Sequence, residues 1–190
     1  MVIIILGLII FFGVHSLSIY NFQLRNSLLA QHGEGRFKGL YSLVSLIGFA
    51  LIVWGYGQAR LSPTVVYVPP AGLKHATLLL MLPFFVLFLS TYLPGKIKAT
   101  LKHPMLVSIK LWALAHLLAN GMLHDVILFV AFLAWAVVDR ISVKKRPAAE
   151  VVPASFNKND VIAIVGGLIL YVVFSMWLHV LLIGVAPITK

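Results

Sequence analysis

Three histidines stand inside apolar runs of the sequence, where a side chain that needs hydrogen-bond partners is costly to bury. They are His15 in FFGVHSL, His116 in WALAHLL and His179 in MWLHVL. A neutral imidazole carries one donor and one acceptor, and an ionisable group inside an apolar segment is a candidate functional residue. His32 is expected in a loop, and His75 and His124 near helix ends, where an imidazole can stay hydrated.

Depth along the expected helices separates the three candidates. At about 1.5 Å of rise per residue, His116 lies roughly 18 Å from the start of its helix near Pro104. If the first helix continues to Arg25, His15 lies roughly 15 Å from the same surface. By the same rise His179 would lie about 28 Å up, near the opposite headgroups. His15 and His116 are therefore the stronger pair.

Two imidazoles that face each other at one depth could supply both axial nitrogens of a haem iron. Phe11 and Phe12 border the expected face of His15, while Trp112 and Asn120 lie one turn either side of His116. A flat apolar ring could lie against such surfaces. By pattern alone a buried histidine pair is more often a hydrogen-bonded helix contact, so both interpretations stay open at this point.

A cationic cluster opens the helix that carries His116. Lys102 and His103 precede Pro104, which suits the first turn of a helix. Lys110 follows His103 by seven residues, so it lies on nearly the same face, and its long stem can reach the headgroup level. This face indicates an anion-binding site, whose ligand could be a haem propionate, a cofactor phosphate or a lipid phosphate.

Apolar blocks long enough to form membrane helices must position these residues. The chain of 190 residues is 61% hydrophobic and 11% charged, against about 25% charged in soluble domains. The sequence predicts one all-α transmembrane domain over 1–190, a helix bundle with about six spans, and a tight turn at Asn120-Gly121. The expected spans are 2–20, 40–57, 75–92, 104–119, 121–140 and 160–184.

The net charge of +10 is explained by topology rather than by nucleic-acid binding. With both termini outside, three basic residues fall on outward segments (Arg60, Lys74 and Lys190) and one inside a helix (Lys110). The inward segments carry the other eleven: Arg25, Arg36, Lys38, Lys96, Lys98, Lys102, Arg140, Lys144, Lys145, Arg146 and Lys158. This asymmetry follows the positive-inside rule and places the 141–159 loop in the cytoplasm. Residues 1–20 are expected to stay in the mature protein, because no cleavage site follows them.

Several kinds of active site are disfavoured by composition. The chain has no cysteine, which removes thiolate metal sites and thiol nucleophiles. The five acidic residues are expected in loops or at helix ends, so no carboxylate pair is predicted at membrane depth. Gly166-Gly167 lacks the context of a phosphate loop and indicates close helix packing.

The motifs Gly13-Val14-His15-Ser16-Leu17, Lys102-His103-Pro104-Met105-Leu106 and the run from Lys110 to Gly121 resemble the NnrU family of bacterial membrane proteins. The resemblance covers most of the chain. It implies a multi-pass protein of the bacterial inner membrane with a role linked to nitrite and nitric oxide reduction. The family is similar to ζ-carotene isomerase, a haem b enzyme, and this similarity implies that His15 and His116 bind iron. Lys110, His103, Trp112 and Asn120 are then expected around the haem.

Two other functions remain alternatives. The segment from His103 to His116 is more distantly similar to isoprenylcysteine carboxyl methyltransferases, which use S-adenosylmethionine. The chain departs from those enzymes, with Lys102 in place of an arginine and Lys144-Lys145-Arg146 where an acidic pair is expected. The non-enzymatic alternative is an assembly or scaffold protein. Expected partners are membrane lipids, haem, and a hydrophobic substrate or a respiratory redox partner.

Overall fold

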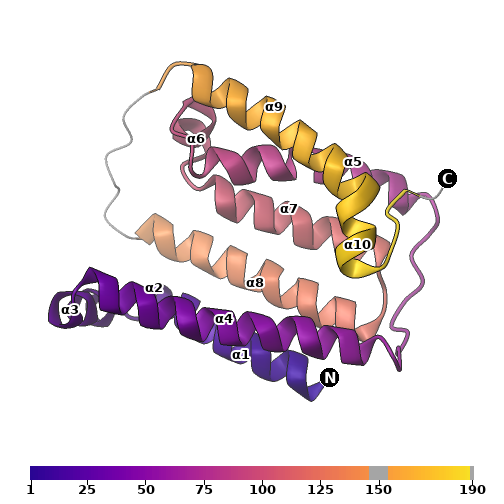
Figure 1. The fold of residues 1–190 in the computed structure, drawn as a ribbon, viewed down its shortest axis with the longest axis horizontal. Coiled ribbons are helices and arrows are strands. Elements are labelled where there is room, and N and C mark those ends of the chain that lie inside the picture. Colours follow the sequence, from indigo (N-terminus) through magenta and orange to yellow (C-terminus); the bar gives the residue numbers. More distant parts are fainter. Residues whose placement is uncertain (146–153, 189–190) are drawn as a thin grey trace. The chain divides into compact units, whose positions relative to one another are not determined.

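A computed structural model describes residues 1–145 and 154–188, and the regular elements in these ranges are helices (Figure 1). In chain order they are α1 (Val2–His15), α2 (Leu17–Tyr20), α3 (Phe22–His32), α4 (Glu34–Ala59), α5 (Leu73–Ser90), α6 (Lys96–Leu101), α7 (Pro104–Ala119), α8 (Leu123–Lys145), α9 (Lys158–Val173), the π-helical segment η1 (Phe174–Leu178) and α10 (His179–Ile183). The all-α prediction is confirmed. Residues 146–153, within the predicted cytoplasmic loop, lie outside the described residues.

Within residues 1–145 and 154–188, four helical segments are long and apolar enough to cross a membrane. They are α4, α5, α8 and the continuous run Lys158–Ile183 from α9 to α10. Two more predicted spans correspond to apolar helices of 14 and 16 residues, α1 and α7, where a span usually needs about 17–25. The prediction of a membrane protein is supported, and the count of six spans with both termini outside stays a prediction.

The chain forms two compact units. Unit 1 comprises Met1–Tyr67 and Gly121–Lys145, and therefore α1 to α4 with α8. Unit 2 comprises Val68–Asn120 and Arg146–Lys190, and its described helices are α5, α6, α7, α9, η1 and α10. The expectation of a single transmembrane domain over 1–190 stays a prediction.

In unit 1, α1 lies directly against α4 because glycines leave room for the two backbones. A β-carbon on Gly7 would stand 2.7 Å from the backbone nitrogen of Ile52, and one on Gly48 would stand 2.7 Å from that of Phe11. Small residues permit such close approach of membrane helices. α8 completes the unit through aromatic side chains, with the rings of Phe12 and Phe132 4.9 Å apart.

In unit 2, α5 lies between α7 and α9 and contacts both. Thr77 Oγ1 donates to the carbonyl of Ala115 at 2.9 Å, which ties α5 to α7. A β-carbon on Gly167 would stand 2.5 Å from the backbone nitrogen of Val86. The close helix packing predicted from Gly166-Gly167 is therefore confirmed for Gly167.

The first helix does not continue to Arg25, so the depth estimate for His15 rested on a wrong premise. α1 ends at His15, α2 ends at Tyr20, and α3 begins after Asn21. Asn21 has φ −146° and ψ 78°, and its side-chain oxygen accepts a hydrogen bond from the backbone nitrogen of Leu24 at 2.8 Å. The asparagine thus interrupts one helix and caps the next.

The Asn120-Gly121 pair ends α7, but Asn120 is extended (φ −130°, ψ 123°) and does not form the tight turn that the sequence predicts. The carbonyl of Gly121 accepts hydrogen bonds from the backbone nitrogens of Val66 (2.8 Å) and Tyr67 (3.1 Å). A β-carbon at Gly121 would overlap the carbonyl oxygen of Tyr67, so glycine is required there. This contact holds the segment after α4 against the start of α8 within unit 1.

Candidate functional site

His15 ends α1 with its ring held among aromatic side chains of unit 1. Its Nδ1 donates to the carbonyl oxygen of Phe11 at 2.7 Å, one turn earlier on the same helix. The imidazole stacks on the Phe11 ring, with centroids 4.1 Å apart and planes inclined by 24°. Tyr41 of α4 and Trp135 of α8 approach the ring at 5.2 and 5.9 Å. The side chain is half-buried in an aromatic environment.

His116 has the same local geometry in unit 2. Its Nδ1 donates to the carbonyl oxygen of Trp112 at 2.8 Å, again one turn back along the helix, and the Trp112 ring centroid lies 5.4 Å away. Asn120 donates to the His116 carbonyl from both its backbone nitrogen and its side-chain Nδ2, each at 2.9 Å. The two residues predicted beside His116, Trp112 and Asn120, are thus in direct contact with it.

These hydrogen bonds determine the tautomer of both rings. A carbonyl oxygen only accepts, so Nδ1 carries the proton in each neutral imidazole and Nε2 carries the lone pair. An iron ligand needs that state, with the second nitrogen donating to a carbonyl that orients the ring. The donor chemistry of His15 and of His116 therefore fits an axial haem ligand, each within its own unit.

Among residues 1–145 and 154–188, no group of three or more His, Asp or Glu side chains is placed to hold a metal ion. A haem needs only axial ligands from the protein, because the macrocycle supplies the other four nitrogens. The pairing of His15 with His116 takes one histidine from each unit and stays a prediction.

His179 lies beside His116. The depths estimated from the helical rise per residue did not predict this contact. The two rings are 6.5 Å apart between centroids and nearly parallel, with planes inclined by 18°. Counting residues put the two about 10 Å apart in depth, assuming straight α-helices. The chain instead passes through the π-helical segment η1, and Figure 1 shows α10 turned away from the line of α9. π-Helical segments often occur at functional sites.

The predicted cationic cluster occupies the link between α6 and α7. The backbone nitrogen of His103 donates to the Leu101 carbonyl at 2.7 Å, and Lys102 between them has φ 61° and ψ −44°. This γ-turn is a strained conformation for a residue with a side chain. Pro104 is buried at the first position of α7, and Lys110 lies half-buried two turns along the helix. An anion bound by Lys102, His103 or Lys110 stays a prediction.

One buried polar cluster was not predicted from the sequence. His124 and Asp125 at the start of α8 are only 5% and 4% exposed, although His124 was expected to be hydrated near a helix end. Tyr56 of α4 donates to Asp125 Oδ1 at 2.6 Å, and its ring meets the His124 ring at 5.1 Å. The expectation for His124 was wrong because the partner, Tyr56, is far away in sequence.

Comparison with known proteins supports the resemblance found in the motifs. No curated protein and no solved structure matches the chain. The NnrU protein family matches residues 3–187, which is nearly the whole chain and includes both units. The match spans His15, the cluster at Lys102 and the run from Lys110 to Gly121 that carried the resemblance. The chain therefore belongs to the NnrU family.

Proposed function

We propose that this NnrU-family protein binds haem b with His15 and His116 as axial ligands, in the bacterial inner membrane. The observation that carries the proposal is the shared tautomer: each imidazole donates from Nδ1 to a backbone carbonyl one turn earlier, at 2.7 and 2.8 Å. Each Nε2 thus holds the lone pair that a metal needs. The role would be redox or isomerase-type, linked to nitrogen-oxide metabolism as the family resemblance implies.

The protein's own groups would orient and shield the site. The aromatic rings of Phe11, Tyr41 and Trp135 surround His15 and would keep water from one axial position. The hydrogen bonds to Phe11 and Trp112 restrict ring rotation and raise the basicity of the ligating nitrogen. When bound, haem would supply one-electron redox chemistry whose potential depends on these axial ligands and on burial.

The test is the absorption spectrum of protein purified in mild detergent from cells that make haem. We expect a Soret band with a six-coordinate, low-spin spectrum in the wild type. His15→Ala and His116→Ala should each give a five-coordinate spectrum or lose haem, because each removes one axial nitrogen. His75→Ala, at the start of α5, is the matched control and should leave the spectrum unchanged.

His179→Ala distinguishes two ligand arrangements. If His15 and His116 are the axial pair, this variant keeps the six-coordinate spectrum. A five-coordinate spectrum in His179→Ala with a normal spectrum in His15→Ala would instead assign the second position to His179, whose ring lies 6.5 Å from His116. Absence of a Soret band after haem supplementation, with binding of S-adenosylmethionine, would favour methyl transfer. Absence of both would favour a scaffold.

A further inference from the structure

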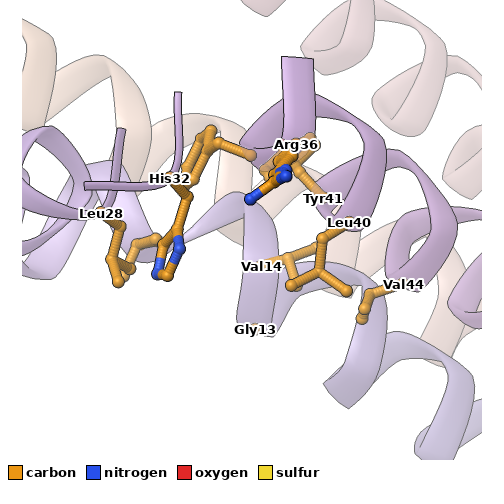
Figure 2. Close-up of a pocket in the computed structure, with 10 residues that line it drawn as sticks. Gly13, Val14, Leu28, His32, Arg36, Leu40, Tyr41 and Val44 are labelled. Atoms are coloured by element: carbon orange, nitrogen blue, oxygen red, sulfur yellow. The ribbon is translucent and has the colours of Figure 1, made fainter. Parts of the chain in front are cut away.

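Unit 1 contains an open groove of about 520 Å³ between the end of α1, α2, α3 and the start of α4. Its walls are mostly apolar, with Val14, Leu17, Leu28, Leu40 and Val44 among the lining side chains. Figure 2 shows His32 and Arg36 among the residues that line the same groove. One pocket thus presents a long apolar surface together with two nitrogen-bearing side chains.

The charge at the groove is positive. His32 and Arg36 are exposed, and neither side chain forms a hydrogen bond or ion pair within residues 1–145 and 154–188. The one acidic residue nearby in sequence, Glu34, is paired with Lys38 at 2.5 Å on the exposed surface of α4. The residues that line the groove include no carboxylate. Arg36 is therefore available to an external anion.

A second guanidinium stands close to the groove. Arg25 of α3 lies over the ring of Phe37, 5.9 Å from its centroid, and Phe37 lines the groove. The position of α3 depends on the turn at Gly33, whose φ of 75° is unfavourable for other residues and allows α3 to fold beside the start of α4. Two short-range features, Gly33 and the cap at Asn21, thus build the groove.

Because the groove lies at the start of a candidate spanning helix, we expect it at the level of the lipid headgroups. α4 is a candidate spanning helix, and the groove residues Arg36 to Val44 belong to its first three turns. α3 has 11 residues, among them Gln23, Arg25, Asn26 and Gln31, and is too short and too polar to span the bilayer. It is expected to lie in the interface, where basic side chains attract anionic lipids.

We propose that this groove binds one anionic phospholipid from the leaflet that faces the α3–α4 turn. The phosphate is held by Arg36 and His32, and an acyl chain lies along Val14, Leu17 and Val44. A soluble anion would leave the apolar walls in contact with water, whereas an acyl chain covers them. A zwitterionic lipid would bring an amine to a site that offers no carboxylate. The proposal concerns unit 1 alone and does not depend on haem.

Native mass spectrometry of the delipidated protein in detergent tests the proposal. With palmitoyl-oleoyl phosphatidylglycerol we expect one lipid to bind clearly more tightly than the phosphatidylcholine of the same chains. Arg36→Gln should weaken that binding roughly fivefold, the usual value of one basic side chain at an anionic lipid. Arg25→Gln should weaken it less, because Arg25 lies over Phe37 and does not line the groove.

Gly13→Leu tests the acyl part of the groove. A β-carbon at Gly13 meets no atom within 4 Å, so the leucine fits the fold and occupies the space of the acyl chain. This variant should abolish the tight lipid. Gly57→Leu is the matched control, because Gly57 of α4 also has open space and does not line the groove.

Three results would overturn the proposal. Equal affinity for the two lipids would show that the cations do not select the headgroup. Tight binding that survives Gly13→Leu would place the lipid elsewhere. Competition by glycerol 3-phosphate, which carries the headgroup charge without acyl chains, would show a site for a soluble anion. The thermal midpoint of each variant must stay near that of the wild type, which the open space at Gly13 and the exposure of Arg36 predict.

Discussion

At the scale of single residues, His15 and His116 are oriented by their own helices. Each ring is bonded to the carbonyl four residues earlier, so its tautomer does not depend on any distant element. Both residues are predicted from the sequence by their place in apolar runs, by their similar expected depth and by the resemblance to the NnrU family. The sequence could not identify the stack of His116 on His179, because that contact depends on how α10 departs from the line of α9.

Substitution of Lys110 tests whether the predicted cationic cluster on α7 binds an anion. It is half-buried and forms no hydrogen bond or ion pair among the described residues, so its loss leaves no partner unsatisfied. Lys110→Ala should lower haem retention or propionate binding several-fold, because it removes a cation expected to bind the propionate. The thermal midpoint should stay within roughly 2 °C of the wild type, because no partner is left unsatisfied. The haem-to-protein ratio after purification measures the effect. An unchanged ratio would remove Lys110 from the site.

Asp160 is a buried polar residue that joins three backbone segments of unit 2. Its carboxylate is 2% exposed and accepts hydrogen bonds from the backbone nitrogens of Lys96 (2.9 Å), Ile97 (2.8 Å) and Asn157 (3.0 Å). Asp160→Asn turns one acceptor into an NH₂ group that faces a donor, so the thermal midpoint should fall by roughly 5 °C. Glu34→Gln, at an exposed ion pair, is the control. Equal midpoints for the two variants would contradict this role.

At the scale of elements, the contact between α1 and α4 explains how a 14-residue helix is held. Gly7, Gly48 and Gly55 bring the two backbones together, and Ile4 between them is fully buried. The sequence predicted both helices from their apolar composition. It did not predict that the helical path breaks at Asn21, before Arg25, because this break depends on one side-chain cap that the apolar pattern does not show.

Gly48→Leu should separate these two helices. A β-carbon there would stand 2.7 Å from the backbone nitrogen of Phe11, which cannot move as a flexible side chain can. Overpacking of this kind costs about 1–3 kcal/mol of unfolding free energy. Unfolding in a denaturing detergent measures the loss, with Gly57→Leu as the control at an open position of the same helix. A wild-type transition in Gly48→Leu would contradict the close contact.

At the scale of the whole molecule, the distribution of basic residues predicts the orientation in the membrane. Eleven of the fifteen basic residues fall on the segments predicted to face the cytoplasm. The 141–159 loop contributes four of them (Lys144, Lys145, Arg146 and Lys158), although residues 146–153 lie outside the described structure. Ser155, in the described part of this segment, is exposed and offers a place for a probe.

Cysteine labelling tests this orientation without background, because the natural chain has no cysteine. Ser155→Cys should react with a membrane-impermeant maleimide only after the cells are opened. Ser62→Cys, exposed in the segment after α4, should react in intact cells. The reverse pattern would invert the topology and would place the groove at Arg36 in the outer leaflet.

The sequence alone determined the class of the protein and its candidate ligands. Long apolar blocks require a lipid environment whatever the fold, and histidines inside those blocks need partners whatever their neighbours. The tertiary structure decided which side chains meet. The burial of His124 against Tyr56, the approach of His179 to His116 and the groove at Arg36 all join residues that are distant in sequence or separated by a turn. The approach of His179 to His116 and the groove at Arg36 depend on backbone breaks at Asn21, Gly33 and η1, which redirect helices by an amount that apolar periodicity does not encode.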